Sequence, residues 1–313
     1  MMLSLAKDLV RSLGVVLLVT FATFALMYGN AEGIGRAVLG LSATPEDVER
    51  EVTALGLDRP LLVQYGDWLG SAVTGDLGAS FYTSEPVVNA LSTRVPVTLT
   101  LVVIALLLTA VVSVTLGVTA AVRGGWTDRA VQFFSVLGTA VPPYIVAIVL
   151  VFGFAVAWRL FPATGYVPPD RGLTAWALSI TLPVVALLVG AIAGVAAQFR
   201  SAVLDTLGRD YVRTLRARGI AEREVVFRNV LRNAAAPGLT ALSLTMIGLL
   251  GGAVFIEQVF ALPGMGELAI AAGQISDVPM VMGTVLVTIV IVLVVNLLGD
   301  LAVFLLNPKA RTR

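Results

Sequence analysis

Six long stretches without a charged residue decide which class of protein this chain can be. They are residues 12–31, 95–122, 130–158, 172–199, 233–256 and 278–299. A membrane-spanning helix needs roughly 20 mostly apolar residues, because the hydrocarbon core is about 30 Å thick and a helix rises about 1.5 Å per residue. In lipid the backbone must satisfy its own hydrogen bonds, so each stretch is expected to be a helix. The sequence therefore predicts an all-α integral membrane protein, with six transmembrane helices in a single domain over residues 1–313.

The composition leaves little room for a soluble protein. Hydrophobic residues make up 58% of the chain and charged residues only 13%, whereas soluble domains carry about 25% charged residues. A very apolar soluble core is therefore not expected. The sequence contains no cysteine and no histidine, which excludes disulfides, thiolate chemistry and the usual zinc sites.

The distribution of basic residues predicts how the chain is oriented. With six spans, both termini lie on one side, and that side carries 15 basic and 7 acidic residues against 6 basic and 13 acidic on the other. Since lysine and arginine accumulate in cytoplasmic loops, the termini and residues 200–232 are expected in the cytoplasm. Residues 32–94 and 257–277 are then outer segments. A cleaved signal peptide at 12–31 would break this charge pattern, so a retained first helix is favoured.

The outer segment 32–94 contains signals for two short helices. Thr44 is a good N-cap and Pro45 a good first residue, while Gly56 can end the helix. Apolar residues with helical spacing follow between Leu61 and Leu69. Two interpretations of this second element stay open: a helix lying on the outer membrane surface, and a small packing subdomain.

The third charge-free stretch contains Pro142 and Pro143 at its middle. Prolines there free backbone carbonyls and are expected to kink the helix. Such a break can line a pathway or serve packing, and both interpretations stay open. Two glycine pairs, Gly190 with Gly194 and Gly248 with Gly252, have the spacing that lets membrane helices approach closely.

The middles of the six stretches carry no ionisable side chain, and Glu257 and Asp300 are expected at helix ends within reach of water. Proton-coupled carriers place acids or histidines inside the membrane, so a stand-alone secondary carrier is disfavoured. Neither lysine, Lys7 or Lys309, follows a glycine, so the chain cannot bind ATP through a phosphate-binding loop. An intramembrane enzyme would have to be serine-based, and no motif for one is present. If transport is driven, its energy must enter through a partner.

Residues 200–232 form the segment best suited to meet a soluble partner. They carry eight arginines and four acids. Asp210 is predicted to cap a short helix from Tyr211 to Arg218 that ends at Gly219, and a second helix is predicted to start near Ala221 and run through Phe227.

This hairpin is expected to present an apolar surface, made by Tyr211, Leu215 and Ile220, that inserts into a groove of the partner. The arginines around it would pair with acids of that partner. The alternative is that the arginines only set the topology and bind anionic lipid headgroups.

The segment Asp210–Gly219, which reads DYVRTLRARG, resembles the "EAA" coupling loop of ATP-binding-cassette importer permeases. Its form is similar to that of the B-type permease subunit of the dipeptide/oligopeptide/nickel transport family. Five further segments resemble outer motifs of that family: Leu55–Leu61, Gly75–Phe81, Pro162–Gly165, Phe260–Gly266 and Asp277–Pro279.

The chain departs from the family pattern at four places. Leu215 stands where alanine is usual, and Ala221 replaces a serine that would cap the second coupling helix. Tyr28-Gly29-Asn30-Ala31 replaces a Pro-Gly-Asp-Pro turn, and Asn307-Pro308 replaces Asp-Pro. The coupling surface and the first outer turn are therefore expected to differ in shape from those of the family.

The resemblance implies a type I ABC importer-like permease fold in the bacterial inner membrane, forming half of a heterodimeric pore. The implied partners are a second related permease, two ATPase subunits, an extracytoplasmic substrate-binding protein, a peptide substrate and membrane lipid, but no nucleic acid. ATP and magnesium would be bound by the ATPases, so this chain would hold no cofactor and no catalytic residue. Nickel complexes and haem-like ligands remain alternative substrates to dipeptides and longer peptides.

The resemblance also implies two sets of site residues. Coupling to the ATPases is assigned to Asp210, Tyr211, Arg213, Thr214, Leu215, Arg216, Ala217, Gly219, Glu222 and Arg223. A pathway or gate role is considered for Pro142, Pro143, Phe260, Pro263 and Gly264.

Overall fold

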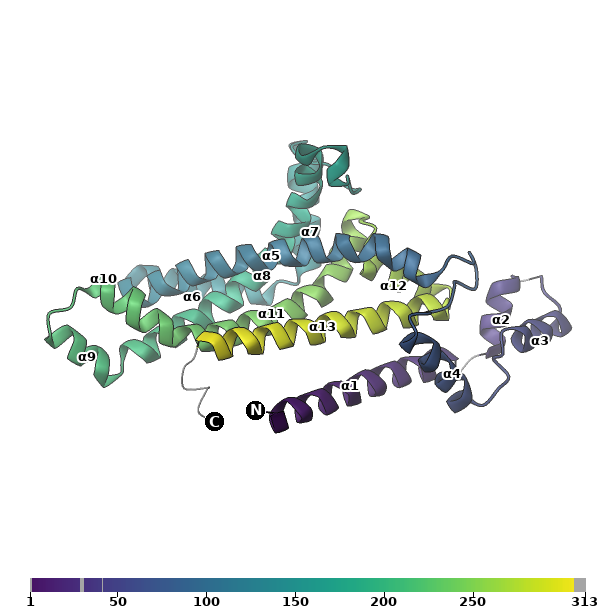
Figure 1. Ribbon diagram of the computed structural model, residues 1–313. Coiled ribbons are helices and arrows are strands. Elements are labelled where there is room, and N and C mark those ends of the chain that lie inside the picture. The colour runs from purple at the N-terminus through teal and green to yellow at the C-terminus, as the bar shows by residue number, and fades with distance from the viewer. Residues whose placement is uncertain (1, 29–30, 41, 307–313) are drawn as a thin grey trace. The chain divides into compact units, whose positions relative to one another are not determined.

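The computed structural model describes residues 2–28, 31–40 and 42–306, and the regular structure of these residues is helical (Figure 1). The family departures at Gly29-Asn30 and Asn307-Pro308 lie outside the described residues. The α-helices are α1 (Met2–Tyr28), α2 (Ala31–Leu39), α3 (Pro45–Ala54), α4 (Leu61–Val73), α5 (Val87–Arg123), α6 (Gly125–Ala140), α7 (Pro143–Leu150), α8 (Leu173–Leu207), α9 (Asp210–Ala217), α10 (Glu222–Glu224), α11 (Leu231–Phe260), α12 (Met265–Gln274) and α13 (Val278–Leu306). Two π-helical segments, η1 (Val151–Ala157) and η3 (Val225–Val230), and one 3-10 turn, η2 (Pro169–Arg171), complete the order.

Five helices of the described chain are long and apolar enough to cross a membrane, and a bent pair brings the number to six. The predicted all-α membrane class is therefore confirmed. The third predicted span differs from the expectation of one kinked helix, because α6 and the α7–η1 segment meet at an angle of 94°. Val141 stands between them in an extended conformation, with φ −92° and ψ 118°. The two prolines that follow lack an N–H group and hold the preceding residue out of the helical region, so the helix breaks instead of bending.

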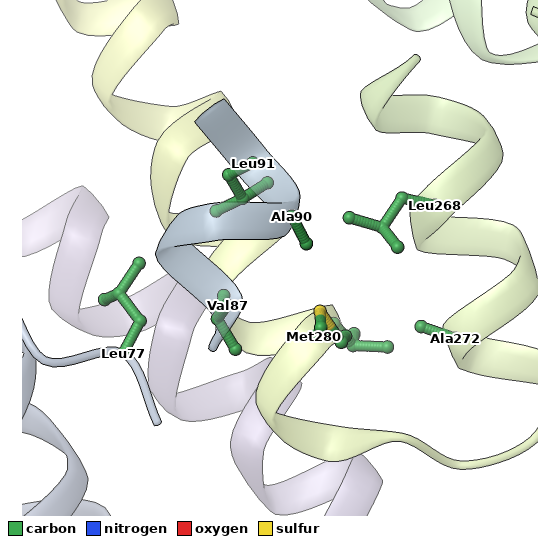
Figure 2. Close-up of a cluster of buried hydrophobic side chains, with 8 residues drawn as sticks. Leu77, Val87, Ala90, Leu91, Leu268, Ala272 and Met280 are labelled. Carbon is green, nitrogen blue, oxygen red and sulfur yellow. The ribbon is translucent and has the colours of Figure 1, made fainter. Parts of the chain in front are cut away.

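Contacts divide the chain into two compact units, and the first comprises Met1–Val97 with Gly264–Leu293. One part of its core lies between the start of α5, α12 and the start of α13, where Val87, Leu91, Leu268 and Met280 converge (Figure 2). A β-carbon on Gly283 would stand 2.3 Å from Val87 Cγ1, so only glycine lets α13 approach α5 this closely.

The outer segment of the first unit follows its sequence signals closely. Thr44 caps α3 in a capping box with Asp47, and Gly56, with φ +68°, follows the end of that helix as predicted. On α4, Tyr65 and Trp68 pack against Phe24 of α1, and the Tyr65 hydroxyl lies 2.9 Å from Thr20 Oγ1. These contacts favour the packing interpretation of residues 61–69.

The second unit comprises Thr98–Pro263 and Val294–Arg313. Within it α6 and α11 run alongside α8 (Figure 1). The predicted close approach through small residues is confirmed for α6 and α8, because Gly190 faces the backbone of Gly138. A β-carbon on Gly138 would stand 2.7 Å from that of Ala193. Of the other predicted pair, Gly252 lies against Leu187, while Gly248 has no atom within 4 Å of its β-carbon position.

The expectation that water reaches Glu257 is wrong, because its side chain is 0% exposed. The Thr98 hydroxyl donates a hydrogen bond of 2.5 Å to its carboxylate. After α11 ends, the chain turns back over the last helical turn, and the Leu262 N–H donates to the Glu257 carbonyl at 2.9 Å. The side chain of Asp300 lies outside the described part of the structure.

Candidate functional site

The arginine-rich segment folds into a helical hairpin at one end of the second unit (Figure 1). Its first arm, α9, follows the end of α8 after only two residues, Gly208 and Arg209. The predicted N-cap is displaced by one position: Arg209 takes the extended N-cap conformation, and Asp210 is the first helical residue. The Asp210 carboxylate still lies at the positive end of the helix dipole, where it favours the start of α9.

Gly219 ends α9 as predicted, in a left-handed conformation with φ +77°. Its N–H donates to the Arg216 carbonyl at 2.9 Å, and the Ile220 N–H donates to the Leu215 carbonyl at 3.3 Å. These two bonds form a Schellman cap, which requires a residue that tolerates positive φ.

The second arm differs from the predicted separate helix. It starts at Glu222, and α10, η3 and α11 continue without interruption to Phe260. Ala221 occupies the N-cap position and makes no side-chain cap bond, which is the structural consequence of the missing serine. The Val225 N–H donates to the Ala221 carbonyl at 3.0 Å, which is the first backbone bond of the helix. The hairpin is therefore a direct extension of the fifth predicted span.

The apolar side of the hairpin packs on the chain's own core, and the three side chains expected to enter a partner's groove, Tyr211, Leu215 and Ile220, are partly buried there. Val212 is fully buried, together with Val225, Val226 and Val230 of η3. Tyr211, Leu215 and Ile220 pack on this same cluster, which also includes Val118, Ala202, Val203 and Ala234. The Asn233 side chain donates to the Tyr211 hydroxyl at 3.1 Å. Burial of this face fixes the hairpin to the ends of α5, α8 and α11.

An ion pair closes the two arms over this core. The Arg216 guanidinium donates two hydrogen bonds to the Glu222 carboxylate, one of them from Nε to Oε2 at 2.9 Å. This bidentate bond raises the pKa of Arg216 above its ordinary value, so the guanidinium stays charged. Arg213 and Asp210 are 3.9 Å apart and mostly exposed, and a pair of this kind contributes little.

The outward face of the hairpin is what a partner can touch. Arg213, Thr214, Ala217 and Gly219 are exposed on the first arm and its end, as is Arg223 on the second. The Thr214 hydroxyl donates back to the Asp210 carbonyl at 3.1 Å. Phe227 is 64% exposed although it is aromatic. The exposed surface is therefore basic with one large aromatic side chain, surrounding the partly buried Tyr211, Leu215 and Ile220.

A second ion pair, between Arg200 of α8 and Asp128 near the start of α6, was not anticipated. The Arg200 Nη2 atom donates to Asp128 Oδ2 at 2.8 Å, and its Nε atom donates to Oδ1. Both side chains are about four-fifths buried. The only signal in the sequence was that both residues are charged and were predicted to lie on the cytoplasmic side of the membrane.

The residues considered for a pathway or gate fall in different environments. Pro142 is exposed, and Pro143 is the first residue of α7. Phe260 is 2% exposed, which leaves its ring no access to a pathway in this structure. Pro263 is exposed, and Gly264 is buried. The Phe260 carbonyl accepts a hydrogen bond of 2.8 Å from the Gly165 N–H, so two of the outer motifs meet in the second unit.

Two other outer motifs meet in the first unit through Asp277. Its carboxylate is buried and accepts hydrogen bonds from the Ser80 hydroxyl at 2.5 Å and from the Phe81 N–H at 3.2 Å. Ser80 Oγ in turn accepts from the N–H groups of Tyr82 and Thr83. Asp277 therefore fastens the 75–83 loop to the α12–α13 turn, a contact that spacing in the sequence could not predict.

The chain matches two family descriptions over nearly its full length. Residues 113–312 match the binding-protein-dependent transport system inner membrane component, and residues 1–102 match the N-terminal part of the same kind of component. A putative peptide transport system permease protein of Brucella abortus is 37% identical over 306 residues, which cover 97% of this chain and 98% of the relative. A dipeptide transport system permease protein of Lactococcus lactis subsp. cremoris is 32% identical, with 98% of this chain and 100% of the relative covered.

Among solved structures, the MetNI methionine ABC transporter in an inward-facing conformation is similar in fold. The TM-score is 0.56 at 24% identity, and the match covers 72% of this chain and 100% of the other. This similarity agrees with the predicted type I importer-like permease fold. Together with the six candidate spans, these matches identify a multi-pass membrane protein, and the chain belongs to the family of inner membrane components of binding-protein-dependent transport systems.

Proposed function

We propose that this chain is a permease subunit of an ATP-driven peptide importer and forms half of its translocation pathway. The names of the full-length relatives, which are peptide and dipeptide permeases, support a peptide over nickel or haem as the substrate. The second half of the pathway is a related permease, and the substrate arrives from an extracytoplasmic binding protein. Two ATPase subunits bind ATP and magnesium and carry out hydrolysis. This chain itself contributes no catalytic residue and no cofactor.

The proposed orientation places the termini and the α9–α10 hairpin in the cytoplasm. The bias of basic residues supports this orientation, since 15 of the 21 lysines and arginines fall on that side. The exposed arginines of the hairpin then face the ATPase subunits, whose acidic side chains would pair with them and set the register of docking.

One observation carries the proposed coupling mechanism: both arms of the hairpin lead directly into long helices. The first arm is two residues from α8, and the second continues into α11. The valine cluster holds the hairpin against both helices. A displacement of the hairpin on ATP binding is therefore transmitted to α8 and α11 as a rigid movement. To convert the inward-open state into an outward-open state, ATP and the binding protein must bind the two states with different affinities.

The first test is to purify the tagged chain from its native membrane in mild detergent and to identify by mass what remains bound. The proposal predicts a second six-helix permease and ATPase subunits. In the Arg213→Glu/Arg218→Glu variant, both substitutions lie on the exposed face, so the ATPases should be lost while the second permease is retained. Arg171→Glu, an exposed arginine outside the hairpin, is the matched control.

A chain that purifies alone and catalyses uptake in liposomes without ATP would instead be a secondary carrier. In that case the arginines of residues 200–232 would serve topology or lipid binding. Retention of the ATPases by the double variant would reject the hairpin as the docking surface while leaving the importer assignment intact.

A further inference from the structure

The break between α6 and α7 leaves backbone groups without a partner. Pro142 and Pro143 have no N–H, so the carbonyls of Gly138 and Thr139 lack the donors that a continuous helix would supply. Val141 is extended, so its carbonyl turns away from the axis of α6, and among the described residues no hydrogen bond reaches that carbonyl. The break therefore presents three carbonyl acceptors without a helical donor, those of Gly138, Thr139 and Val141.

The break lies near the middle of the charge-free stretch 130–158, far from the charged residues at its two ends. Val141 is 12 residues beyond Arg129, the last charged residue before it, which corresponds to about 18 Å along a helix. Non-helical backbone at such depth is tolerated only where protein covers it or where it borders water. Thr139, Ala140 and Pro142 are exposed, so this chain does not cover the break itself.

The surroundings differ on the two sides of the break. On one side, Val141 and Val146 line a cavity of about 500 Å³ whose wall is almost entirely apolar, so this cavity cannot satisfy the free groups. On the α11 side, Gly252 lies close to Pro143, and Tyr144 and Phe255 form an aromatic pair with ring centroids 6.4 Å apart. Gly251, which is exposed, has no atom within 4 Å of its β-carbon position, so α11 leaves open space there.

We propose that the break at Val141 is a binding site for the backbone of an extended peptide inside the translocation pathway. This inference rests on the proposed function and specifies how its substrate is held. The peptide would donate its backbone N–H groups to the carbonyls that the break leaves open, first of all to that of Val141. Main-chain pairing gives affinity without reading side chains. The aromatic pair and the open glycine positions leave room for side chains of different sizes.

Accessibility of the break to water can be measured cleanly, because the chain has no cysteine of its own. The full importer carries single substitutions Ala140→Cys, Val141→Cys or Tyr144→Cys and is treated with a charged methanethiosulfonate reagent. Phe152→Cys, on the exposed surface of η1, is the matched control for a lipid-facing position. The expected result is labelling at the three break positions, protection by trialanine, and no labelling at the control.

Backbone recognition is tested by a double substitution, Pro142→Ala/Pro143→Ala, which restores two N–H groups and lets the helix close its free carbonyls. Uptake of trialanine is compared with uptake of trialanine methylated on its backbone nitrogens. The wild type should discriminate against the methylated peptide roughly tenfold more strongly than the double variant, since one hydrogen bond is typically worth about a factor of ten. The same binding protein delivers the peptides to the wild-type importer and to the double variant. Its own preference for one of the two peptides therefore cancels in this comparison.

Three outcomes would overturn the inference. One is a break that stays unlabelled in a transporter with normal uptake, which would mean that the partner permease or lipid covers it. The second is labelling without protection by trialanine. The third is equal discrimination by the wild type and the double variant. Absence of ATP-dependent trialanine uptake by the wild type would reject the proposed peptide importer instead, and labelling would still report whether the break meets water.

Discussion

Exchanging Arg216 and Glu222 distinguishes two roles of Arg216, closing the hairpin and contacting an ATPase, which a single substitution would change together. Arg216→Glu removes a bidentate ion pair and also places two carboxylates at the closure of the hairpin. A loss of coupling in that variant could then come from an opened hairpin or from a lost contact with an ATPase. The double variant Arg216→Glu/Glu222→Arg restores the pair with its charges exchanged, so the hairpin can close while the charge at position 216 is reversed.

The structure gives the size of the effect. The two side chains are 44% and 49% exposed, so solvent screens their attraction. An exposed pair of good bidentate geometry stabilises by about 1 kcal/mol, which is roughly a fivefold change in the closing equilibrium. Repulsion between two carboxylates at about 4 Å in a watery environment adds about 1 kcal/mol. Arg216→Glu should therefore shift the hairpin toward opening by about 2 kcal/mol, and the double variant should recover most of it.

The assay is peptide uptake per ATP hydrolysed by the complete importer in proteoliposomes. Because both guanidinium bonds of Arg216 end on Glu222, we expect Arg216→Glu to uncouple hydrolysis from uptake and the reversed pair to restore coupling. Arg171→Glu is the matched comparison, since the same chemical change falls on an exposed arginine outside the hairpin. A reversed pair that remains as uncoupled as Arg216→Glu would refute this reasoning and make Arg216 a contact to the partner.

Three further predictions follow from close contacts. Gly219→Ala strains the left-handed cap and should cost about 1 kcal/mol of stability, which is too little to abolish coupling. Gly219→Pro also removes the N–H that bonds to the Arg216 carbonyl, so this variant should insert normally into the membrane and lose coupling. Asp277→Asn weakens the hydrogen bonds to Ser80 and Phe81, which together are worth about 1–3 kcal/mol. The variant should therefore lower the melting temperature of the purified permease and expose the 75–83 loop to protease, and unchanged proteolysis would contradict this role. Gly138→Ala should destabilise the α6–α8 contact by about 1–3 kcal/mol, measured by thermal unfolding, because its β-carbon would meet that of Ala193. Gly194→Ala is the control in the same assay, since the nearest atom to its β-carbon lies at 3.8 Å.

The sequence was most informative where a local rule decides the structure. Charge-free stretches of this length predict helices in lipid because a helix satisfies the backbone hydrogen bonds within its own segment. Thr44 and Gly219 mark helix ends because cap geometry depends on only a few neighbouring residues. These features depend on the residue type and its immediate neighbours, which a single sequence contains.

Features that depend on distant segments could not be read in this way. Whether Glu257 is buried depends on Thr98 and on the return of the chain after α11, and neither has a sequence signal. Two consecutive prolines predict a disturbed helix, but the angle of 94° between α6 and the segment after the break also depends on how the flanking segments pack. Tyr211, Leu215 and Ile220 look the same in the sequence whether they face a partner or the chain's own valines.

The inward packing of the hairpin changes where recognition of an ATPase must be sought. A face that buries Val212 and covers η3 keeps only part of its apolar surface free for a groove in another protein. Affinity for the partner must then come from the opposite face, where arginines surround little apolar surface. Such a surface sets register and association rate more than affinity, so a hairpin that must stay attached through a cycle needs an apolar anchor as well. Of the apolar side chains on the second arm, Phe227 remains exposed at 64% and is the one able to anchor the contact. If the Phe227→Ala permease binds its ATPases as tightly as the wild type does, charge alone holds the complex together. The affinity between permease and ATPases should then fall steeply with added salt.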